Sequence, residues 1–335
     1  TPQFSAAHEG VRTDFTISGN AEIVKAWNGS SEVELPALRL GIDSSTRLAN
    51  EFVLHAGGDL NVSRELMSAP GLAPEILSTP TSVTGAARIG LERAVGRFNI
   101  RLDGDIARTL YGDTHRSNTG ITSNSHNNMW EAGAKLRVGY AVSPVYEVFG
   151  EAGVSRDIFD AVSPSLGVKT DATARTLRVG VAGKFDERLT ATASIGVGQH
   201  DFDDGALTDI TTQLYDAGIV YRPNSTIALS GNLATTITPS GADSAGTAKV
   251  EHSANLGLAY TVNSWLRLRA SADWRQSRLE GTSETEQRYG FGTGADYVLG
   301  AKTALSADYS FEHRDNNVSG EVDTHKVSVG ITLRR

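Results

Sequence analysis

The feature that most constrains this chain is an alternation of apolar and polar side chains in almost every stretch of ten or more residues, from about Asp14 to Leu333. Successive side chains on a β-strand point to opposite faces of the sheet. Near residue 270, Leu268 and Trp274 fall on one face and Arg269 on the other. A long strand with one apolar and one charged face fits a closed barrel that has lipid outside and water inside.

Composition agrees with a barrel and excludes several other classes of protein. The 335 residues show no compositional break, which predicts one domain over residues 1–335. The hydrophobic content of 39% suits a wall in which only alternate residues face lipid. The net charge of -8 argues against a nucleic-acid partner, and the absence of cysteine excludes disulfides, thiolate metal sites and cysteine nucleophiles. The sequence has no apolar run long enough for a transmembrane helix, and it shows no leader peptide for export.

The pattern predicts an all-β, transmembrane, antiparallel up-and-down barrel of about sixteen strands. The predicted strand centres are residues 20, 38, 57, 87, 104, 134, 150, 178, 194, 215, 231, 255, 270, 292, 308 and 329. Each predicted strand is at least as long as the ~9–11 residues that cross a bilayer at a tilt.

Short and long connections alternate along the chain. Short turns are expected near Asp43–Arg47, Ala94–Arg97, Val142–Pro144, Asp186–Arg188, Arg222–Ser225, Val262–Ser264 and Gly300–Lys302. Longer links are expected at Met67–Pro80, Gly112–Asn127, Asp160–Thr173, Asp201–Leu207, Pro239–Thr247, Glu280–Glu286 and Arg314–Asp323. Outer-membrane barrels have short periplasmic turns and longer external loops, so both termini are expected on the periplasmic side.

The alternation also divides the candidate residues between two faces. The candidate lumen-lining residues are Arg88, Arg101, Asp103, Asp105, Lys135, Arg137, Glu147, Glu151, Arg178, Lys184, Arg267, Arg269, Asp273, Arg275 and Asp296. The candidate lipid-facing residues are Leu102, Leu136, Val148, Val179, Leu266, Leu268, Val329 and Ile331. Charges of both signs can ionise and pair in a wet lumen, where they could orient solutes. Alternatively, the same charges form a salt-bridged plug with no role in transport.

Enzymatic readings of the sequence are weak. Gln199–Gly205 gathers a histidine and several carboxylates, which could bind calcium or activate water at a rim, but a solvated loop explains it better. The histidines lack metal-ligand spacing, and neither a nucleophile elbow nor a P-loop occurs. We therefore expect no catalytic residues, no metal and no cofactor.

Several segments resemble the putative beta-barrel porin 2 family. They are Ser143–Arg156, Asp216–Pro223, Gly294–Leu299 and His325–Leu333, and the similarity runs from about His8 to the end. The resemblance implies an outer-membrane barrel of Gram-negative bacteria, with members found beside exopolysaccharide secretion systems. It implies no catalytic residues.

Two features depart from that resemblance. Family members usually carry additional sequence before the region that matches His8, so strands that precede Thr1 would raise the count to eighteen. Many outer-membrane proteins end in an aromatic residue that the insertion machinery recognises, whereas this chain ends Leu333–Arg335.

The expected function is therefore a non-enzymatic, porin-like channel in the bacterial outer membrane. Its expected partners are outer-membrane lipid and small polar solutes, with polysaccharide and periplasmic export components implied by the resemblance. Few inward aromatic residues are evident as sugar platforms, and Phe149 is one exception. The alternative function is a barrel that scaffolds another component of the cell envelope or surface.

Overall fold

The structure is a computed structural model that describes residues 2–25, 33–64, 76–239 and 246–333. Within these residues, seventeen strands form one large sheet. They are β1 (Gln3–Glu9), β2 (Thr13–Lys25), β3 (Val33–Arg47), β4 (Phe52–Arg64), β6 (Thr81–Val95), β7 (Phe98–Tyr111), β10 (Met129–Ala141), β11 (Tyr146–Phe159), β12 (Ala172–Phe185), β13 (Leu189–Phe202), β14 (Ile210–Tyr221), β15 (Ile227–Pro239), β16 (Ala248–Thr261), β17 (Leu266–Leu279), β18 (Thr285–Gly300), β19 (Thr303–Asn316) and β20 (Gly320–Leu333).

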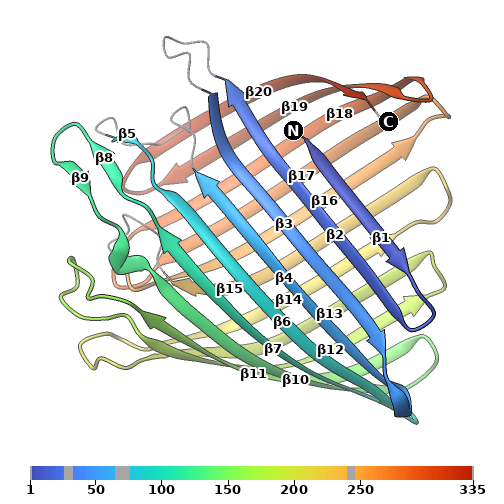
Figure 1. The fold of residues 1–335 in the computed structure, drawn as a ribbon, viewed down its shortest axis with the longest axis horizontal. Helices are drawn as coiled ribbons and strands as arrows, with labels where there is room; N and C mark the ends of the chain where they lie inside the picture. Colours follow the sequence, from blue (N-terminus) through green and yellow to red (C-terminus); the bar gives the residue numbers. More distant parts are fainter. Residues whose placement is uncertain (1, 26–32, 65–75, 240–245, 334–335) are drawn as a thin grey trace.

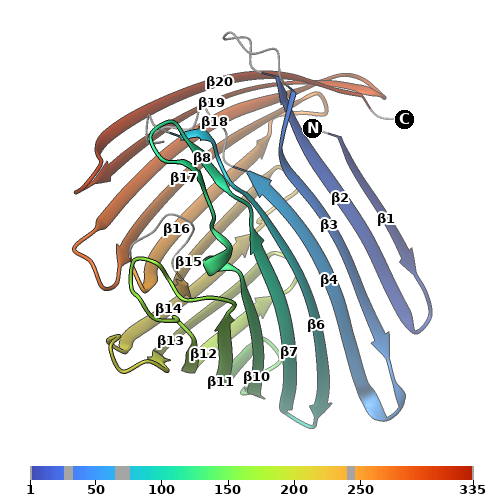
Figure 2. The same ribbon diagram turned by 60° about the vertical axis from the view of Figure 1, so that its left-hand side comes forward.

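Each strand pairs antiparallel with the next strand of this sheet, so the chain runs up and down around a strongly curved wall (Figures 1 and 2). The all-β, antiparallel up-and-down arrangement is as the alternation predicted. No helix among the described residues is long and apolar enough to span a membrane.

The strand count differs from the prediction at the N-terminal end. All sixteen predicted centres fall in strands of the large sheet, but β1 was not predicted. Its seven residues, QFSAAHE, carry small or polar side chains at most positions, so they give little apolar alternation. β1 forms because each of its residues pairs with β2, from Gln3 opposite Asn20 to Glu9 opposite Asp14.

Two predicted connections were misplaced. Asp43–Arg47 is not a turn, because β3 continues to Arg47 and the connection is made by residues 48–51, where Asn50 and Glu51 adopt positive φ. The predicted long link Arg314–Asp323 is instead a tight connection of residues 317–319. Asn316 Oδ1 accepts hydrogen bonds from the backbone N–H groups of Val318 and Ser319, which closes this turn.

The connections fall into two sets at opposite ends of the wall. Residues 10–12, 48–51, 96–97, 142–145, 186–188, 222–226, 262–265 and 301–302 form what we call the short-turn end. The other end, the long-link end, carries residues 112–128, 160–171 and 203–209 among others. β20 ends at the short-turn end, whereas Gln3 of β1 lies partway along the wall, opposite Asn20.

Closure of the barrel is not seen between the two edge strands. No ladder joins β1 and β20 in the described part of the chain. Seventeen strands in an antiparallel succession leave the first and the last parallel to each other. The edges therefore cannot meet in the antiparallel pairing that the rest of the wall uses.

The long-link end has folded structure of its own. The link between β7 and β10 contains β8 (Thr114–Arg116) and β9 (Gly120–Thr122), which join β5 (Ile76–Ser78) in a second, three-stranded sheet. The buried Asn124 amide donates hydrogen bonds to the Gly112 carbonyl and to Thr114 Oγ1. These bonds fix the link against the end of β7.

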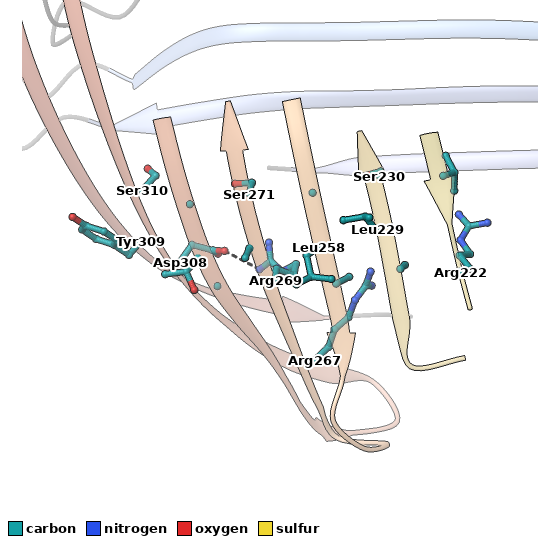
Figure 3. A pocket seen from close by; sticks show the side chains of 18 residues that line it. Arg222, Leu229, Ser230, Leu258, Arg267, Arg269, Ser271, Asp308, Tyr309 and Ser310 are labelled. Atoms are coloured by element: carbon teal, nitrogen blue, oxygen red, sulfur yellow. Dashed lines mark ion pairs between the residues drawn. The ribbon is translucent and has the colours of Figure 1, made fainter. Parts of the chain in front are cut away.

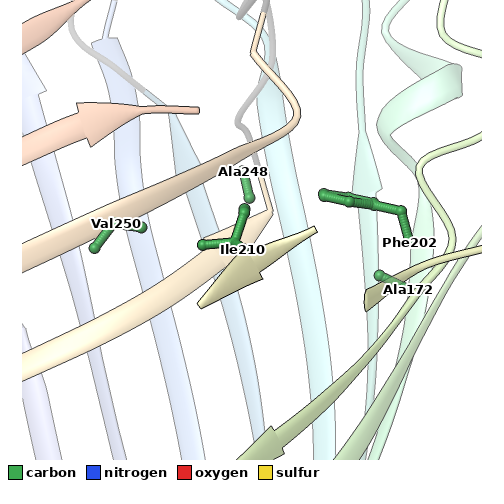
Figure 4. Packing of buried hydrophobic residues seen from close by; sticks show 5 residues of the cluster. All are labelled: Ala172, Phe202, Ile210, Ala248 and Val250. Atoms are coloured by element: carbon green, nitrogen blue, oxygen red, sulfur yellow. The ribbon is translucent and has the colours of Figure 1, made fainter. Parts of the chain in front are cut away.

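The wall changes at the seam between β14 and β15. Their ladder covers only Asp216–Tyr221 opposite Leu229–Ala234, which is half the length of most other ladders. Beyond it, residues 235–239 and 248–252 form what we call the hairpin tip. Figure 4 shows Val250 and Ala248 of this tip near Ile210, in a buried cluster that also contains Phe202 and Ala172.

The cluster shows that the hairpin tip lies inside the wall. Ile237 Cδ1 is 3.3 Å from the position that a Cβ on Gly198 would occupy, although β15 is not the neighbour of β13. By strand parity, Ala248 and Val250 share the side of β16 that carries Leu258, yet they are fully buried. Apolar side chains that would otherwise face outward are thus covered by the inner side of β12–β14.

Candidate functional site

The strand register sorts the side chains into two continuous faces. Directly opposed residues of an antiparallel pair lie on the same face. One such row passes from Glu92 through Arg101, Arg137 and Glu151 to Arg178, across five successive strands of the large sheet. We call the face that carries this row the charged face and the opposite one the apolar face.

The structure places all fifteen candidate lumen-lining residues on the charged face and all eight candidate lipid-facing residues on the apolar face. The charged face is the concave side of the wall. On it, Arg88 of β6 reaches Asp43 of β3 at 2.5 Å, across the intervening strand β4. Gly57 leaves room for this contact, because a Cβ there would lie 2.7 Å from Arg88 Nε.

Ion pairs cover the charged face from β6 to β12. Arg101 Nε lies 2.9 Å from Asp103, and Arg137 Nη2 lies 2.8 Å from Glu147. Glu151, whose side chain is only 12% exposed, lies 4.0 Å from Lys135 and 3.9 Å from Arg178. Charges of opposite sign therefore alternate over this half of the concave surface and largely neutralise one another.

A second network lies on β16–β19 and includes residues that were not among the candidates. Glu251 forms ion pairs with Arg275 at 3.2 Å and with Lys249 at 2.6 Å. Further along, Glu286 pairs with Arg288 at 3.3 Å and Arg314 at 2.9 Å. Glu251 follows the alternation of Ala248, Lys249 and Val250, so the sequence carried a signal for it that was missed. Asp43, the partner of Arg88, was missed because it was assigned to a turn.

Near the short-turn end, the charged face of β15–β19 is hollowed by a recess of about 500 Å³ (Figure 3). Its lining includes three arginines, Arg222, Arg267 and Arg269. Arg269 is bound to Asp296 at 2.9 Å and to Asp308 at 2.8 Å. Much of the remaining lining is small: Ser230, Gly257, Ala259, Ser271, Gly292, Gly294 and Ser310.

The apolar face has a boundary along its length. On β13, Ala193, Ile195 and Val197 are followed towards the long-link end by Gln199 and Asp201. On the neighbouring strand β12, the same face changes from apolar to polar at the same level, between Leu177 opposite Val197 and Arg175 opposite Gln199. The apolar band therefore occupies the part of the wall nearer the short-turn end. The polar part of this face, nearer the long-link end, is what we call the polar collar.

Arginines in and beside this collar hold two of the long links. Arg108 Nη1 donates to Asp160 at 2.8 Å, and Arg156 Nη1 donates to Asp203 at 2.7 Å. The hydrogen bond from Arg108 lowers the pKa of the Asp160 carboxyl, and the one from Arg156 lowers the pKa of Asp203. Each carboxylate fixes its link to the end of a strand.

The cluster at Gln199–Gly205 is not a solvated loop throughout, since β13 continues to Phe202. His200 is buried edge-on against Phe202, and Asp201 and Asp203 are paired with Arg175 and Arg156. Within the described residues, no group of three or more histidines and carboxylates is placed to hold a metal ion.

Comparisons with known proteins agree with this architecture. The model of a family described as putative beta-barrel porin 2 matches residues 8–335. Among solved structures, the FrpB iron transporter from Neisseria meningitidis (F3-3 variant) aligns with a TM-score of 0.53 and 10% identity, over 97% of this chain and 60% of that one. The F5-1 variant in its apoprotein form also gives 0.53 at 10% identity, over 93% and 58%.

The chain therefore spans about three fifths of the length of these two transporters. At such low identity the likeness shows the fold alone. No curated protein matches the chain.

Proposed function

The chain belongs to the putative beta-barrel porin 2 family, and from this premise we propose that it forms a water-filled channel across the bacterial outer membrane. The observation that carries the proposal is the division of the wall into a concave charged face and an apolar face. Val179 and Leu102 of the apolar face are 59% and 53% exposed, as expected of side chains that contact hydrocarbon.

A hydrated interior explains the opposite face. Ionised side chains are costly in a dry interior unless they are fully paired and hydrogen-bonded. Here Arg101, Lys135 and Arg269 are 43%, 49% and 39% exposed, so water reaches them beside their carboxylate partners. A barrel of sixteen to eighteen strands is wide enough to leave an aqueous channel.

Orientation and closure belong to the same proposal. The short-turn end faces the periplasm, because outer-membrane barrels carry short turns there, and β20 then ends on the periplasmic side. Unpaired backbone groups cannot be solvated in hydrocarbon, so the wall is closed in the membrane. Either parallel pairing of β1 with β20 or a strand that lies between them completes the hydrogen bonds.

The lining favours small charged or polar solutes over a sugar polymer. Sugars usually stack on exposed aromatic faces, but the buried Phe149 ring on the charged face is covered by the Arg137 guanidinium at 3.6 Å. Polysaccharide export therefore stays an expectation from the family resemblance. Iron transport is a property of the structural neighbours, and the described residues hold no metal-binding group to suggest it here.

Conductance of the purified, detergent-folded protein in planar bilayers tests the proposal. We expect stepwise currents whose reversal potential in a salt gradient shifts when charged-face residues are replaced. Heat-modifiable migration on gels confirms beforehand that the barrel is folded. Folded protein that gives no current at any voltage would contradict the channel and favour the alternative, a barrel that scaffolds another envelope component.

A further inference from the structure

One part of the charged face differs in its charge balance from the rest. From β6 to β12, the arginines at the level of Arg101 each have a carboxylate partner. In the recess near the short-turn end, Arg222 and Arg267 lie within 4.0 Å of no carboxylate among the described residues. The recess thus contains guanidinium groups that are free to bind a solute.

We propose that this recess is a binding site for an anionic oxo group, such as a phosphate or carboxylate, on a solute that passes through the channel. The proposal rests on the proposed function for its route of access, and it names the chemical class of the solute. Guanidinium groups present planar sets of N–H donors that match phosphate and carboxylate oxygens. Rings of arginine or lysine select anions in other pores.

The acidic neighbours do not neutralise the recess. Asp296 and Asp308 both approach Arg269, at 2.9 and 2.8 Å, so both carboxylates are engaged by that residue. Arg267 stands directly opposite Asp296 in the ladder, yet the carboxylate is taken by Arg269. Three arginines therefore face two carboxylates, and the excess positive charge resides on Arg222 and Arg267.

The small residues make the space for the bound group. Ser230 Oγ lies 2.9 Å from the position that a Cβ on Gly257 of the neighbouring strand would occupy. Ser271 Oγ lies 2.5 Å from the corresponding position on Gly292. Glycine at these two positions lets the serine hydroxyls lie flat against the wall. The floor of the recess is therefore formed by small side chains that leave space for a bound group. Its serine hydroxyls can donate hydrogen bonds to an anion that the arginines attract.

Arg222, Arg267 and Arg269, which Figure 3 labels, all line this recess. Arg222 follows β14 directly, whereas Arg267 and Arg269 are alternate residues of β17. Because the recess lies near the short-turn end, an anion bound there sits at the periplasmic mouth of the proposed channel. Focusing of the positive potential in a concave site raises the local concentration of such solutes.

Equilibrium binding of inorganic phosphate to the detergent-folded, full-length protein tests the site without any need for conductance. We expect the ³¹P resonance of phosphate to broaden with the wild-type protein, and Arg267→Gln to weaken binding at least tenfold. Arg275→Gln is the matched control, because Arg275 lies on the same face of β17 but is paired with Glu251. It should bind phosphate as the wild type does.

A second variant guards against misfolding. Arg222→Gln alters a turn residue outside every ladder, and it should also weaken binding while the protein keeps its heat-modifiable migration. Competition of acetate and succinate with phosphate shows whether the site prefers carboxylates or phosphate. Either preference supports an oxoanion site. Absence of wild-type broadening, or equal broadening with Arg267→Gln, would overturn the site, whereas loss of current alone would overturn only the channel.

Discussion

Adjacent residues of one strand have opposite environments in this wall. Leu268 and Arg269 follow each other in β17, but Leu268 stands opposite Tyr260 on the apolar face and Arg269 binds two carboxylates on the charged face. This division was predictable from the sequence because side chains alternate strictly on a strand. The partners of each charge were not predictable, since they depend on the register and on which neighbour is glycine.

Substitutions at these two positions should therefore have unlike effects. Leu268→Arg should impair insertion by about 2–4 kcal/mol, because it places a charge in hydrocarbon near the midplane. Arg269→Leu should leave the barrel folded and shift the reversal potential towards cations. Heat-modifiable migration and reversal potentials measure the two outcomes, and equal loss of folding in both variants would refute the face assignment.

A single carboxylate balances the charges of β10–β12. Glu151 lies within 4.0 Å of both Lys135 and Arg178, so Glu151→Gln leaves two cations without their shared partner. In a hydrated channel we expect a shift of the reversal potential towards anions, with little loss of folded protein. If the charged face were a dry plug, the same variant would instead destabilise the barrel strongly and leave no current to measure.

The alternation predicted which segments form strands better than it predicted where each strand begins and ends. The sixteen alternating segments all became strands, whereas β1, the β3–β4 turn and the final link were missed or misplaced. Turns such as residues 48–51 depend on positive φ values at Asn50 and Glu51, for which the sequence holds no glycine signal. The inward course of the hairpin tip was also unpredictable, because it arises from packing between strands that are not neighbours.

The hairpin tip is held by apolar contacts, so a charge within them should release it. Val250 is 4% exposed, and Val250→Asp would bury an unpaired carboxylate. We expect the tip to leave the inner side of β12–β14 and the single-channel conductance to rise. Thr238→Asp, at an exposed position of the same tip, is the control that should change conductance little. Unchanged conductance in folded Val250→Asp would show that the tip does not narrow the channel.

The two long links pinned by arginine should respond to acid. Since the folded-state pKa values of Asp160 and Asp203 are lowered, docking of the links is favoured above the ordinary carboxyl pKa of about 4. That contribution is lost as the pH falls through the lowered pKa values. A spin label on Ser165→Cys should be more mobile at pH 2 than at pH 6, and the Arg108→Gln variant should be mobile at both. Equal mobility of the first label at both pH values would contradict this.

Taken together, the strands of the proposed barrel present an apolar exterior to lipid and a charged interior to water. The alternation predicted this arrangement because a wall with two such faces is stable only between two solvents. Alternation cannot predict how the barrel closes or its exact number of strands. Both depend on how the edges at β1 and β20 complete their hydrogen bonds. Charge selectivity of the proposed channel, by contrast, would depend on residues that the register already places on the charged face.

Collision measurements on single-cysteine variants at two adjacent positions distinguish a lipid-facing side chain from a water-facing one, and the sequence contains no native cysteine that would interfere. Val179→Cys and Arg178→Cys, each spin-labelled in lipid vesicles, place probes on the apolar and charged faces of β12. We expect oxygen to relax the label at 179 more strongly and a water-soluble nickel complex to relax the label at 178 more strongly. Equal accessibility at both positions, or the reverse order, would contradict this expectation.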